Sequence, residues 1–537
     1  MGTIDDFALS ANLIGRVNVG DLLTRTAARD RERLAVVDGD RRLGYGELDD
    51  EVNKLANAFL REGYARGDVV ALISGNSLEF LETYFACAKT GAVCVPINLG
   101  WSAKEIAYVL DHSRASALVV EAQLAGGVAP ALDGLTGLRD VVVAPGTGAG
   151  FEAGGQGVRW SSMAELVDGA PATPVEVEVL DRDPVSYLYT SGTTSAPKGV
   201  VGSHVAVAIE SMSAALELGV SKTDRMAAMM PMFHTAQLNG LITPFVLAGA
   251  SIFVMRGFDP AQLLELVERE RITHIFGLPM MYSIMLDHPD LAGRDLSSLR
   301  RAIYAMAPMP DEDLRRAIAA FGCEFSLGFG QTEMNPLTTM FRPEDQLSYP
   351  GSVGTQMVNV QVAISDEEGN LLPSGSTGEI VYRGPHAMEG YLRDEDATRS
   401  AFAHGWFHSG DVGHFDEHGV LWFEDRKKDV IKTGGENVSS IEVERALYDS
   451  EPRIQEVVVI GLPHPHWGEA ITAVVVPRTG EVVEEGELLA KAKDHLSSFK
   501  VPKAAVFREG LPRTSTGKVQ KHLLRKELRA LYSEPSE

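Results

Sequence analysis

The sequence predicts an α/β fold. It comprises a large N-terminal domain of helices covering mixed or largely parallel sheets, a β-rich subdomain, and a small α+β C-terminal domain. The chain has 537 residues, and a single hydrophobic core stops growing at roughly 250–300 residues. Helix-like and strand-like patterns alternate through the first half, which favours helices packed on parallel strands. Short strands separated by turn residues then prevail from about residue 324 to residue 424.

The first half alternates between apolar residues at helical spacing and short apolar runs. Ser77 and the capping pair Ser102 and Glu105 mark helix starts, and Gly63 and Gly91 mark helix ends. The predicted elements are a helix over 48–60, a strand over 69–73, a helix from 78 to near 91, a strand over 92–97, a helix from 103 and a strand over 117–120.

The longest apolar run covers 241–255 and is too short for a membrane span, which needs roughly 20 residues. Pro244, Gly249 and Ser251 also interrupt it. The pattern instead predicts a helix that stops at Gly249, followed by a buried strand over 252–255. We therefore expect no membrane span in this chain.

The second half predicts strands over 360–364 and 379–382, then a charge cluster at 425–429. A further αβ set follows, with a helix over 440–449, strands over 457–460 and 470–476, and a helix that runs through 496. The predicted division is a large domain over 1–425 with a β-rich subdomain at about 340–425, a hinge over 426–428 and a small domain over 429–537.

The formal net charge is −25, which disfavours nucleic acid and anionic membrane surfaces as partners. An anionic substrate such as a nucleotide would therefore need local positive charge. The three cysteines, Cys87, Cys94 and Cys323, have no metal-ligand or disulfide-framework spacing. The N-terminus carries acidic residues where a secretory signal would be basic. A cytoplasmic location is expected.

A strand over 185–189 runs directly into a loop rich in hydroxyl groups, Thr190 to Gly199. Gly192 lets backbone N–H groups approach an anion, and Lys198 adds a compact positive charge. Ser191, Thr193 and Thr194 can donate hydrogen bonds. The spacing is not that of a Walker A loop, since Lys198 precedes Gly199. Alone, the stretch fits a phosphate cradle or a flexible surface turn equally well.

Three later segments can also be interpreted in two ways, either as surface turns or as parts of a nucleotide site. The segment from Gly328 to Glu333 (GFGQTE) places an aromatic ring beside a carboxylate that could hold Mg²⁺. The segment WFHSGD ends in Asp411, which could accept hydrogen bonds from two ribose hydroxyls. The segment PRTSTGK presents Lys518 on a second loop of small residues.

The ordered set SGTTSAPKG, PMFH, FGQTE, TGE, WFHSGD, DRKKD, KTGGENV and PRTSTGK resembles the adenylate-forming (ANL) superfamily, and its acyl-CoA synthetases in particular. The resemblance covers about Leu22 to Leu524. It implies an ATP-dependent acid–thiol ligase that forms an acyl-adenylate with ATP and Mg²⁺ and then transfers the acyl group to coenzyme A. The implied partners are therefore ATP, coenzyme A and a carboxylic acid, and a homodimer is one option for the assembly.

The resemblance also implies roles for individual residues in adenylation. The residues of the phosphate cradle would be Ser191, Gly192, Thr193, Thr194 and Lys198. Thr332 would bind the α-phosphate, Glu333 would bind Mg²⁺, and Lys518 would bridge the carboxylate and the α-phosphate. Residues around adenine and ribose would be Ala307, Pro308, Gly328, Phe329, Gly330, Asp411 and Arg426. Positioned cations of this kind make the approach of two anions tolerable.

For the thioester-forming step, the resemblance implies that the small domain swings about Lys428. This movement would withdraw Lys518 and bring in Gly434 and Gly435, whose lack of side chains suits the thin pantetheine arm. His234 in PMFH would gate the surroundings of the carboxylate between the two steps.

The sequence indicates the residues of the acyl pocket less clearly. Thirteen of the seventeen methionines lie between Met226 and Met357, which makes this stretch a candidate for its lining. Flexible thioethers such as those of Met306 and Met309, beside the small Ala305, suit a bulky hydrophobic acid. Core filling would also explain any one of them.

Two positions depart from the pattern of the superfamily, which usually has glycine at Ser195 and often tyrosine at Phe329. A side chain at Ser195 would cost ~1–2 kcal/mol if the loop needs a positive φ there. The Ser195 departure raises one alternative to a complete ligase, an enzyme that performs only the thioester half-reaction. Two further alternatives are an enzyme with the same adenylation motifs that transfers to a carrier-protein thiol, and a nucleotide-binding regulator without turnover.

Overall fold

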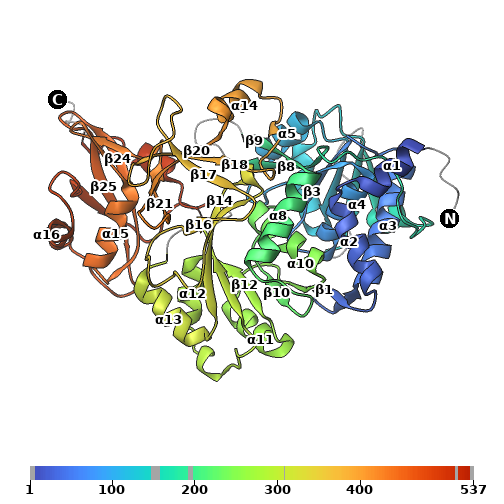
Figure 1. Ribbon diagram of the computed structural model, residues 1–537, viewed down its shortest axis with the longest axis horizontal. Coiled ribbons are helices and arrows are strands. Elements are labelled where there is room, and N and C mark those ends of the chain that lie inside the picture. Colours follow the sequence, from blue (N-terminus) through green and yellow to red (C-terminus); the bar gives the residue numbers. More distant parts are fainter. Residues whose placement is uncertain (1–6, 147–157, 191–196, 307–308, 515–517, 533–537) are drawn as a thin grey trace. The chain divides into compact units, whose positions relative to one another are not determined.

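The computed structural model of the chain describes residues 7–146, 158–190, 197–306, 309–514 and 518–532 (Figure 1). The chain divides into two compact units. The first unit contains residues 1–350, 354–361 and 383–402, and the second contains residues 351–353, 362–382 and 403–537. The α/β class predicted from the sequence is confirmed, because both units combine helices with sheets.

Eight strands in the described ranges of the first unit form one sheet. The six adjacent strands from β8 to β7 run parallel to one another, whereas β9 pairs antiparallel with both β8 and β19. The order is β19 (Gly390–Tyr391), β9 (Lys198–Ser203), β8 (Pro184–Thr190), β4 (Val93–Pro96), β3 (Val69–Ile73), β5 (Ala117–Glu121), β6 (Asp140–Ala144) and β7 (Arg159–Ser162). One face packs a buried cluster against which Tyr187 and Tyr189 are half-buried, as the alternation in their strand predicts.

A second sheet of the first unit has nine strands, counted over its described residues. The order is β16 (Thr355–Gln356), β15 (Leu337–Phe341), β14 (Glu324–Gly330), β13 (Arg301–Tyr304), β12 (His274–Gly277), β10 (Arg225–Ala228), β11 (Ser251–Val254), β1 (Leu34–Asp38) and β2 (Arg41–Gly44). Pairing is parallel from β14 to β1 and antiparallel at both edges. This arrangement confirms the mixed or largely parallel sheets expected from alternating elements.

The helices of the first unit begin and end where local signals predict. Ser77 Oγ accepts a hydrogen bond from the Phe80 N–H at 3.1 Å, and Gly91 ends the same helix at φ 74°. Ser102 and Glu105 form the predicted capping box. The helices are α1 (Phe7–Gly15), α2 (Val19–Arg29), α3 (Tyr45–Arg61), α4 (Leu78–Thr90), α5 (Ala103–Ser113), α6 (Ala122–Val128), α7 (Met163–Val167), α8 (His204–Glu217), α11 (Pro260–Glu270), α12 (Pro279–Leu286), α13 (Asp311–Phe321), α14 (Glu395–Ala401), and the short turns η1 (Ala129–Ala131) and η3 (Leu291–Gly293).

The apolar run over 241–255 forms the predicted helix, glycine stop and strand. Gly249 has φ 80° at the end of α10 (Thr243–Ala248), and β11 follows. The helical segment begins earlier than expected, with α9 (Thr235–Gln237) and the π-helical turn η2 (Leu238–Ile242). None of the helices in the described ranges combines the length and hydropathy needed to cross a bilayer.

The second unit contains two further sheets in its described residues. One has the order β17 (Gln361–Ser365), β18 (Gly378–Arg383), β20 (Phe407–Phe415) and β21 (Leu421–Arg426). The other joins β23 (Glu436–Val438), β22 (Ile431–Thr433), β25 (Gly468–Pro477) and β24 (Ile454–His464), with β26 (Ala504–Phe507) parallel to β25. Its helices are α15 (Ser440–Ser450), α16 (Glu485–His495), α17 (Lys521–Glu527) and the short η5 (Ala403–Gly405). The α+β character predicted for the C-terminal part is confirmed.

Strands of the range 340–425 are divided between sheets. β15 and the edge strand β16 extend the nine-stranded sheet, and the edge strand β19 extends the eight-stranded sheet. The separate four-stranded sheet is built from β17, β18, β20 and β21. The second compact unit runs through 426–428 without a break. The hinge and the two domain boundaries remain predictions.

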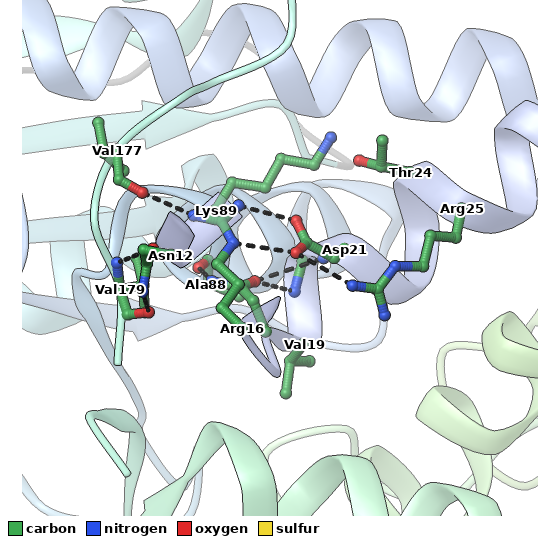
Figure 2. Close-up of polar contacts among 12 residues, drawn as sticks. Asn12, Arg16, Val19, Asp21, Thr24, Arg25, Ala88, Lys89, Val177 and Val179 are labelled. Atoms are coloured by element: carbon green, nitrogen blue, oxygen red, sulfur yellow. Dashed lines mark hydrogen bonds and ion pairs between the residues drawn. The ribbon is translucent and has the colours of Figure 1, made fainter. Parts of the chain in front are cut away.

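A buried polar cluster fixes the N-terminal helices onto the rest of the first unit (Figure 2). The Arg16 guanidinium donates two hydrogen bonds to the Asp21 carboxylate, at 3.0 and 2.9 Å, and a third to the Val177 carbonyl at 2.6 Å. Asn12 exchanges two hydrogen bonds with the backbone of Val179, at 2.8 and 3.2 Å. The Arg16 side chain is only 4% exposed. Removing either partner of such a buried pair leaves an uncompensated charge.

Three histidines in the described part of the chain are buried, namely His204, His274 and His386. Burial lowers the pKa of each imidazole to about 4, because a charged ring would lose its hydration. The unfolded chain binds these protons near pH 6.5. Between pH 6.5 and about 4 these rings therefore hold more protons in the unfolded state than in the folded state, and their contribution to stability falls as the pH falls.

We expect these rings to lower the urea midpoint of unfolding between pH 6.5 and pH 5, whereas the buried carboxyls of Glu82 and Glu210, whose pKa burial raises, act in the opposite direction. His386→Gln should reduce this dependence because it removes one titrating ring. The glutamine amide can still donate to the Leu337 carbonyl that His386 Nε2 contacts at 3.1 Å, so the contact is kept. Unfolding curves at half-unit pH steps measure the effect. The same pH dependence in His386→Gln and in the wild type would contradict the neutral state of the His386 ring.

Candidate active site

The glycine- and hydroxyl-rich loop connects two antiparallel strands. Strand β8 ends at Thr190, which pairs with Lys198 at the start of β9. The two strands are therefore the arms of a hairpin, and Lys198 begins its second arm. The predicted phosphate ligands Ser191, Gly192, Thr193 and Thr194, together with the unusual Ser195, lie outside the described residues.

Lys198 and Glu333 both contact Tyr391. The Lys198 ammonium lies 4.8 Å from the centre of the Tyr391 ring, and the Tyr391 hydroxyl donates to Glu333 Oε1 at 3.0 Å. Burial, and then the neighbouring Glu333 carboxylate, raises the pKa of the Tyr391 hydroxyl, which keeps it protonated as a donor. The Met388 N–H also donates to the Glu333 carbonyl at 2.7 Å. A cation and a carboxylate predicted separately from the sequence thus meet around one aromatic ring.

Thr332 and Glu333 follow a sharply constrained glycine at the end of β14. Gly330 has φ 156°, and a Cβ built on it would lie 2.0 Å from the Pro336 carbonyl oxygen. That oxygen accepts a hydrogen bond from the Gln331 N–H at 2.8 Å. The short helix η4 (Thr332–Met334) begins immediately afterwards. The close approach of two backbone segments explains why glycine is required at this position.

The remaining predicted residues of this segment lie on β14 itself. Gly328 is buried, and a Cβ there would come within 2.9 Å of the Leu337 side chain. Phe329 is half-buried and pairs in register with Thr339 on β15. Its exposed part leaves an aromatic surface at the strand end.

His234 is half-buried at the start of α9, where its Nδ1 accepts a hydrogen bond from the Ala236 N–H at 3.2 Å. The chain just before it is fixed by Asn76, which is 4% exposed. The Asn76 amide donates to the carbonyls of Met230 at 3.0 Å and Met255 at 2.9 Å, and its oxygen accepts from the Met232 N–H at 2.9 Å. A buried amide with this many partners holds the PMFH segment in one conformation.

The small-residue segment after β13 begins with a strained residue. Met306 has φ 74°, a left-handed conformation that is uncommon for a side-chain-bearing residue. Ala305 before it is buried, whereas Ala307 and Pro308 lie outside the described residues. Four other methionines of the stretch from Met226 to Met357, namely Met230, Met232, Met309 and Met334, are buried.

In the second unit, Asp411 and Arg426 lie opposite each other on the neighbouring strands β20 and β21. Arg426 Nε is 3.4 Å from Asp411 Oδ1. The Asp411 side chain is 6% exposed and that of Arg426 is 41% exposed. The carboxylate is therefore held by the sheet, while the guanidinium reaches solvent.

Gly434 and Gly435 form the two-residue turn between β22 and β23, with φ 60° and 89°. Positive φ at both positions is the condition for the tight hairpin turn that suits twisted strands. The Gly434 N–H donates to the Trp467 carbonyl at 2.8 Å, and a Cβ at Gly434 would lie 3.1 Å from the Trp467 ring. These glycines are thus also required by local structure.

The two remaining predicted lysines are exposed. Lys428 lies in the turn directly after β21. Lys518 lies on a small loop closed by the pairing of Arg513 with Val519, and its N–H donates to Thr514 Oγ1 at 3.1 Å. Residues 515–517 of that loop are outside the described ranges.

Sequence reasoning missed Tyr391 and Asn76. Strand β19 has only two residues, so it shows no periodicity, and its place beside β9 depends on long-range pairing. Asn76 resembles any polar residue before a helix, and its four backbone partners lie far along the chain.

Comparisons with known proteins identify the family of the chain. The family model described as AMP-binding enzyme matches residues 23–392, and the model described as AMP-binding enzyme C-terminal domain matches residues 442–518. This chain is an AMP-binding enzyme. The motifs from SGTTSAPKG to PRTSTGK extend through both matched regions.

Relatives of this AMP-binding enzyme include acyl-CoA ligases of similar length. A feruloyl-CoA synthase from Amycolatopsis sp is 35% identical over 508 residues, covering 95% of this chain and 98% of that protein. The long-chain-fatty-acid–CoA ligase FadD13 of Mycobacterium tuberculosis is 34% identical over 515 residues, covering 96% and 99%. The structure of the anthranilate CoA ligase AuaEII with anthranoyl-AMP has a TM-score of 0.87 at 27% identity, covering 96% and 98%.

These relationships confirm the resemblance to the adenylate-forming superfamily and its acyl-CoA synthetases. The AMP-binding enzyme is an AMP-forming acid–thiol ligase, which uses ATP to join a carboxylic acid to coenzyme A.

Proposed function

We propose that this acyl-CoA ligase activates a lipophilic carboxylic acid and that Lys198, Thr332, Glu333 and Lys518 act in the adenylation step. The observation that supports the proposal most directly is the meeting of Lys198 and Glu333 around Tyr391. A phosphate-binding cation and a carboxylate at one place are what a nucleotide triphosphate with a divalent cation requires.

Glu333 fits Mg²⁺ held mainly by a nucleotide. No group of three or more potential metal-ligating side chains occurs within the part of the chain that the structure describes. Mg²⁺ at nucleotide sites usually needs only one or two carboxylates, because phosphate oxygens and water complete its shell. When bound, Mg²⁺ would neutralise phosphate charge, and Glu333 and the hydroxyl of Thr332 would orient the α-phosphate for attack by the substrate carboxylate.

The other nucleotide contacts follow from the same assignment. The buried Asp411 carboxylate would accept hydrogen bonds from the ribose hydroxyls, and Arg426 beside it would hold its orientation. Phe329 would pack on adenine. The further contacts proposed for the nucleotide are Ser191, Gly192, Thr193, Thr194, Ala307, Pro308, Gly328 and Gly330.

For thioester formation we propose that the C-terminal part turns about Lys428, so that the Gly434–Gly435 turn replaces the loop of Lys518 beside the adenylate. The tight glycine turn offers a narrow surface to the pantetheine arm of coenzyme A. His234, half-buried at the start of a helix that continues into a π turn, would gate the carboxylate site.

The lipophilic nature of the acid is supported by two observations. The two relatives are named for ferulate and long-chain fatty acids, both of which have large apolar bodies. The methionines Met230, Met232, Met309 and Met334 give this part of the chain an adaptable apolar interior. We also place the reaction in the cytoplasm, with which three unpaired cysteines agree.

Mass spectrometry of the products from ATP, Mg²⁺ and a panel of acids tests this function, with coenzyme A added or withheld. We expect acyl-AMP without coenzyme A and acyl-CoA with it. For aromatic or long-chain acids, kcat/KM should exceed that for acetate at least ~10-fold, the smallest discrimination expected from added apolar contact.

Two results would contradict the proposal. Conversion of supplied acyl-AMP to acyl-CoA without any adenylation would show an enzyme of the second half-reaction alone. Efficient transfer to a carrier-protein thiol, with coenzyme A inactive, would show a different acceptor.

A further inference from the structure

We propose that Tyr391 is a positioning residue for the triphosphate and its divalent cation, holding Lys198 with its ring and Glu333 with its hydroxyl. This inference rests on the proposed function, in which Lys198 binds phosphate and Glu333 binds Mg²⁺. Tyr391 would touch neither the acid nor the reacting atoms.

The ring of Tyr391 determines where the Lys198 side chain lies. The ammonium is 4.8 Å from the ring centre, within the range in which the negative face of an aromatic ring attracts a cation. Lysine has a long stem with several rotatable bonds, so an ammonium without such a contact samples many positions. The ring thus keeps the cation at the base of the phosphate loop.

The hydroxyl of Tyr391 determines the orientation of the Glu333 carboxylate. It donates to Oε1 at 3.0 Å and leaves the other oxygen, Oε2, for a further ligand. A hydrogen bond to an ionised carboxylate is stronger than one between neutral groups, so it fixes the torsions of the side chain. This is the relation that a ligand of a metal commonly has with a neighbouring donor.

The backbone of Tyr391 is fixed on both sides. Tyr391 pairs with Val200 on β9, two residues beyond Lys198, and its N–H donates to Thr398 Oγ1 at 2.9 Å. Gly390 before it has φ 151°, and a Cβ there would lie 2.9 Å from the Thr398 side chain. The backbone of Tyr391 therefore belongs to the same sheet as Lys198, which fixes the point from which the ring extends.

The two contacts can be separated by substitution, and this gives the test. Tyr391→Phe keeps the ring and removes the hydroxyl. We expect it to raise the Mg²⁺ concentration for half-maximal pyrophosphate release by ~10-fold, as for loss of one hydrogen bond to a charged group. The KM for ATP at saturating Mg²⁺ should stay within about twofold. Tyr391→Leu removes the ring as well and should raise this KM ~10-fold, because Lys198 loses its support.

Binding supplies a readout that is independent of turnover. Calorimetric titration of the full-length enzyme with Mg²⁺ in the presence of α,β-methylene-ATP should show the same weakening in Tyr391→Phe. Tyr187→Phe is the matched control, since Tyr187 is a half-buried tyrosine on β8, which β9 separates from β19 in the same sheet, and it lies outside the proposed site. Thermal melting of each variant verifies that it folds.

Glu333→Gln separates the inference from the function on which it rests. If Glu333→Gln weakens Mg²⁺ binding, the double variant with Tyr391→Phe should be no weaker than Glu333→Gln alone, because the hydroxyl acts through that carboxylate. If Mg²⁺ binding is unchanged in Tyr391→Phe but weakened in Glu333→Gln, only the role of Tyr391 is overturned. An unchanged dependence in Glu333→Gln would overturn both assignments.

Discussion

Lys518→Ala is expected to slow adenylation at least ~10²-fold while leaving thioester formation from supplied acyl-adenylate within about twofold. Adenylation brings a carboxylate toward a phosphate, and Lys518 would supply the charge that makes this approach tolerable. The lysine is exposed on a small loop closed by the pairing of Arg513 with Val519, so removal of its side chain leaves no cavity. Pyrophosphate release and acyl-CoA formation from synthetic acyl-AMP measure the two steps separately.

Lys493→Ala is the matched control, because Lys493 is an exposed lysine on α16 of the same unit and is not assigned to the site. It should leave both rates unchanged. If Lys518→Ala slows both half-reactions equally, Lys518 has no specific role in adenylation.

Gly330→Ala is the second substitution with a large expected effect. A Cβ at this position would lie 2.0 Å from the Pro336 oxygen and 3.0 Å from the Leu337 Cα, so backbone must move. Thr332 and Glu333 follow within three residues, and a displacement of ~1 Å at reacting groups can cost ~10²-fold in rate. We expect adenylation to fall by about this factor and stability to fall by ~1–3 kcal/mol.

Two controls separate collision from backbone conformation. Gly322→Ala has a positive φ of 62° but meets no described atom within 4 Å, and Gly257→Ala meets none and has no positive φ. Gly322→Ala should lose some stability and keep adenylation, whereas Gly257→Ala should keep both. Adenylation by Gly330→Ala at the wild-type rate would mean that the Thr332–Glu333 segment tolerates the displacement.

Elements with local signals could be predicted from the sequence, whereas elements that depend on distant partners could not. The helix from Ser77 to Gly91 has its cap, apolar face and stop in one stretch, so its limits were predictable. By contrast, β15 and β16 join their sheet through pairing with β14, and β19 joins another sheet through pairing with β9. No local sequence pattern contains these pairings. The π turn at Leu238–Ile242 likewise has no local signal.

The candidate site shows the same limit. The motifs predicted Lys198 as a phosphate ligand and Glu333 as a Mg²⁺ ligand, without placing the two side by side. The resemblance implied that Asp411 and Arg426 lie around the nucleotide. That Asp411 and Arg426 lie opposite each other follows from the register of β20 and β21, which the sequence does not specify. Tyr391 joins the first two only because the two-residue strand β19 pairs with β9.

The cluster around Arg16 has a consequence for the limits of a self-sufficient folding unit. The family match begins at residue 23. Asn12 and Arg16, which donate hydrogen bonds to the carbonyls of Val179 and Val177, come before that residue. A chain cut at the family boundary would leave Val177 and Val179 without these partners. The smallest unit able to satisfy these polar groups therefore begins at or before Asn12, earlier than the residue at which the family match begins.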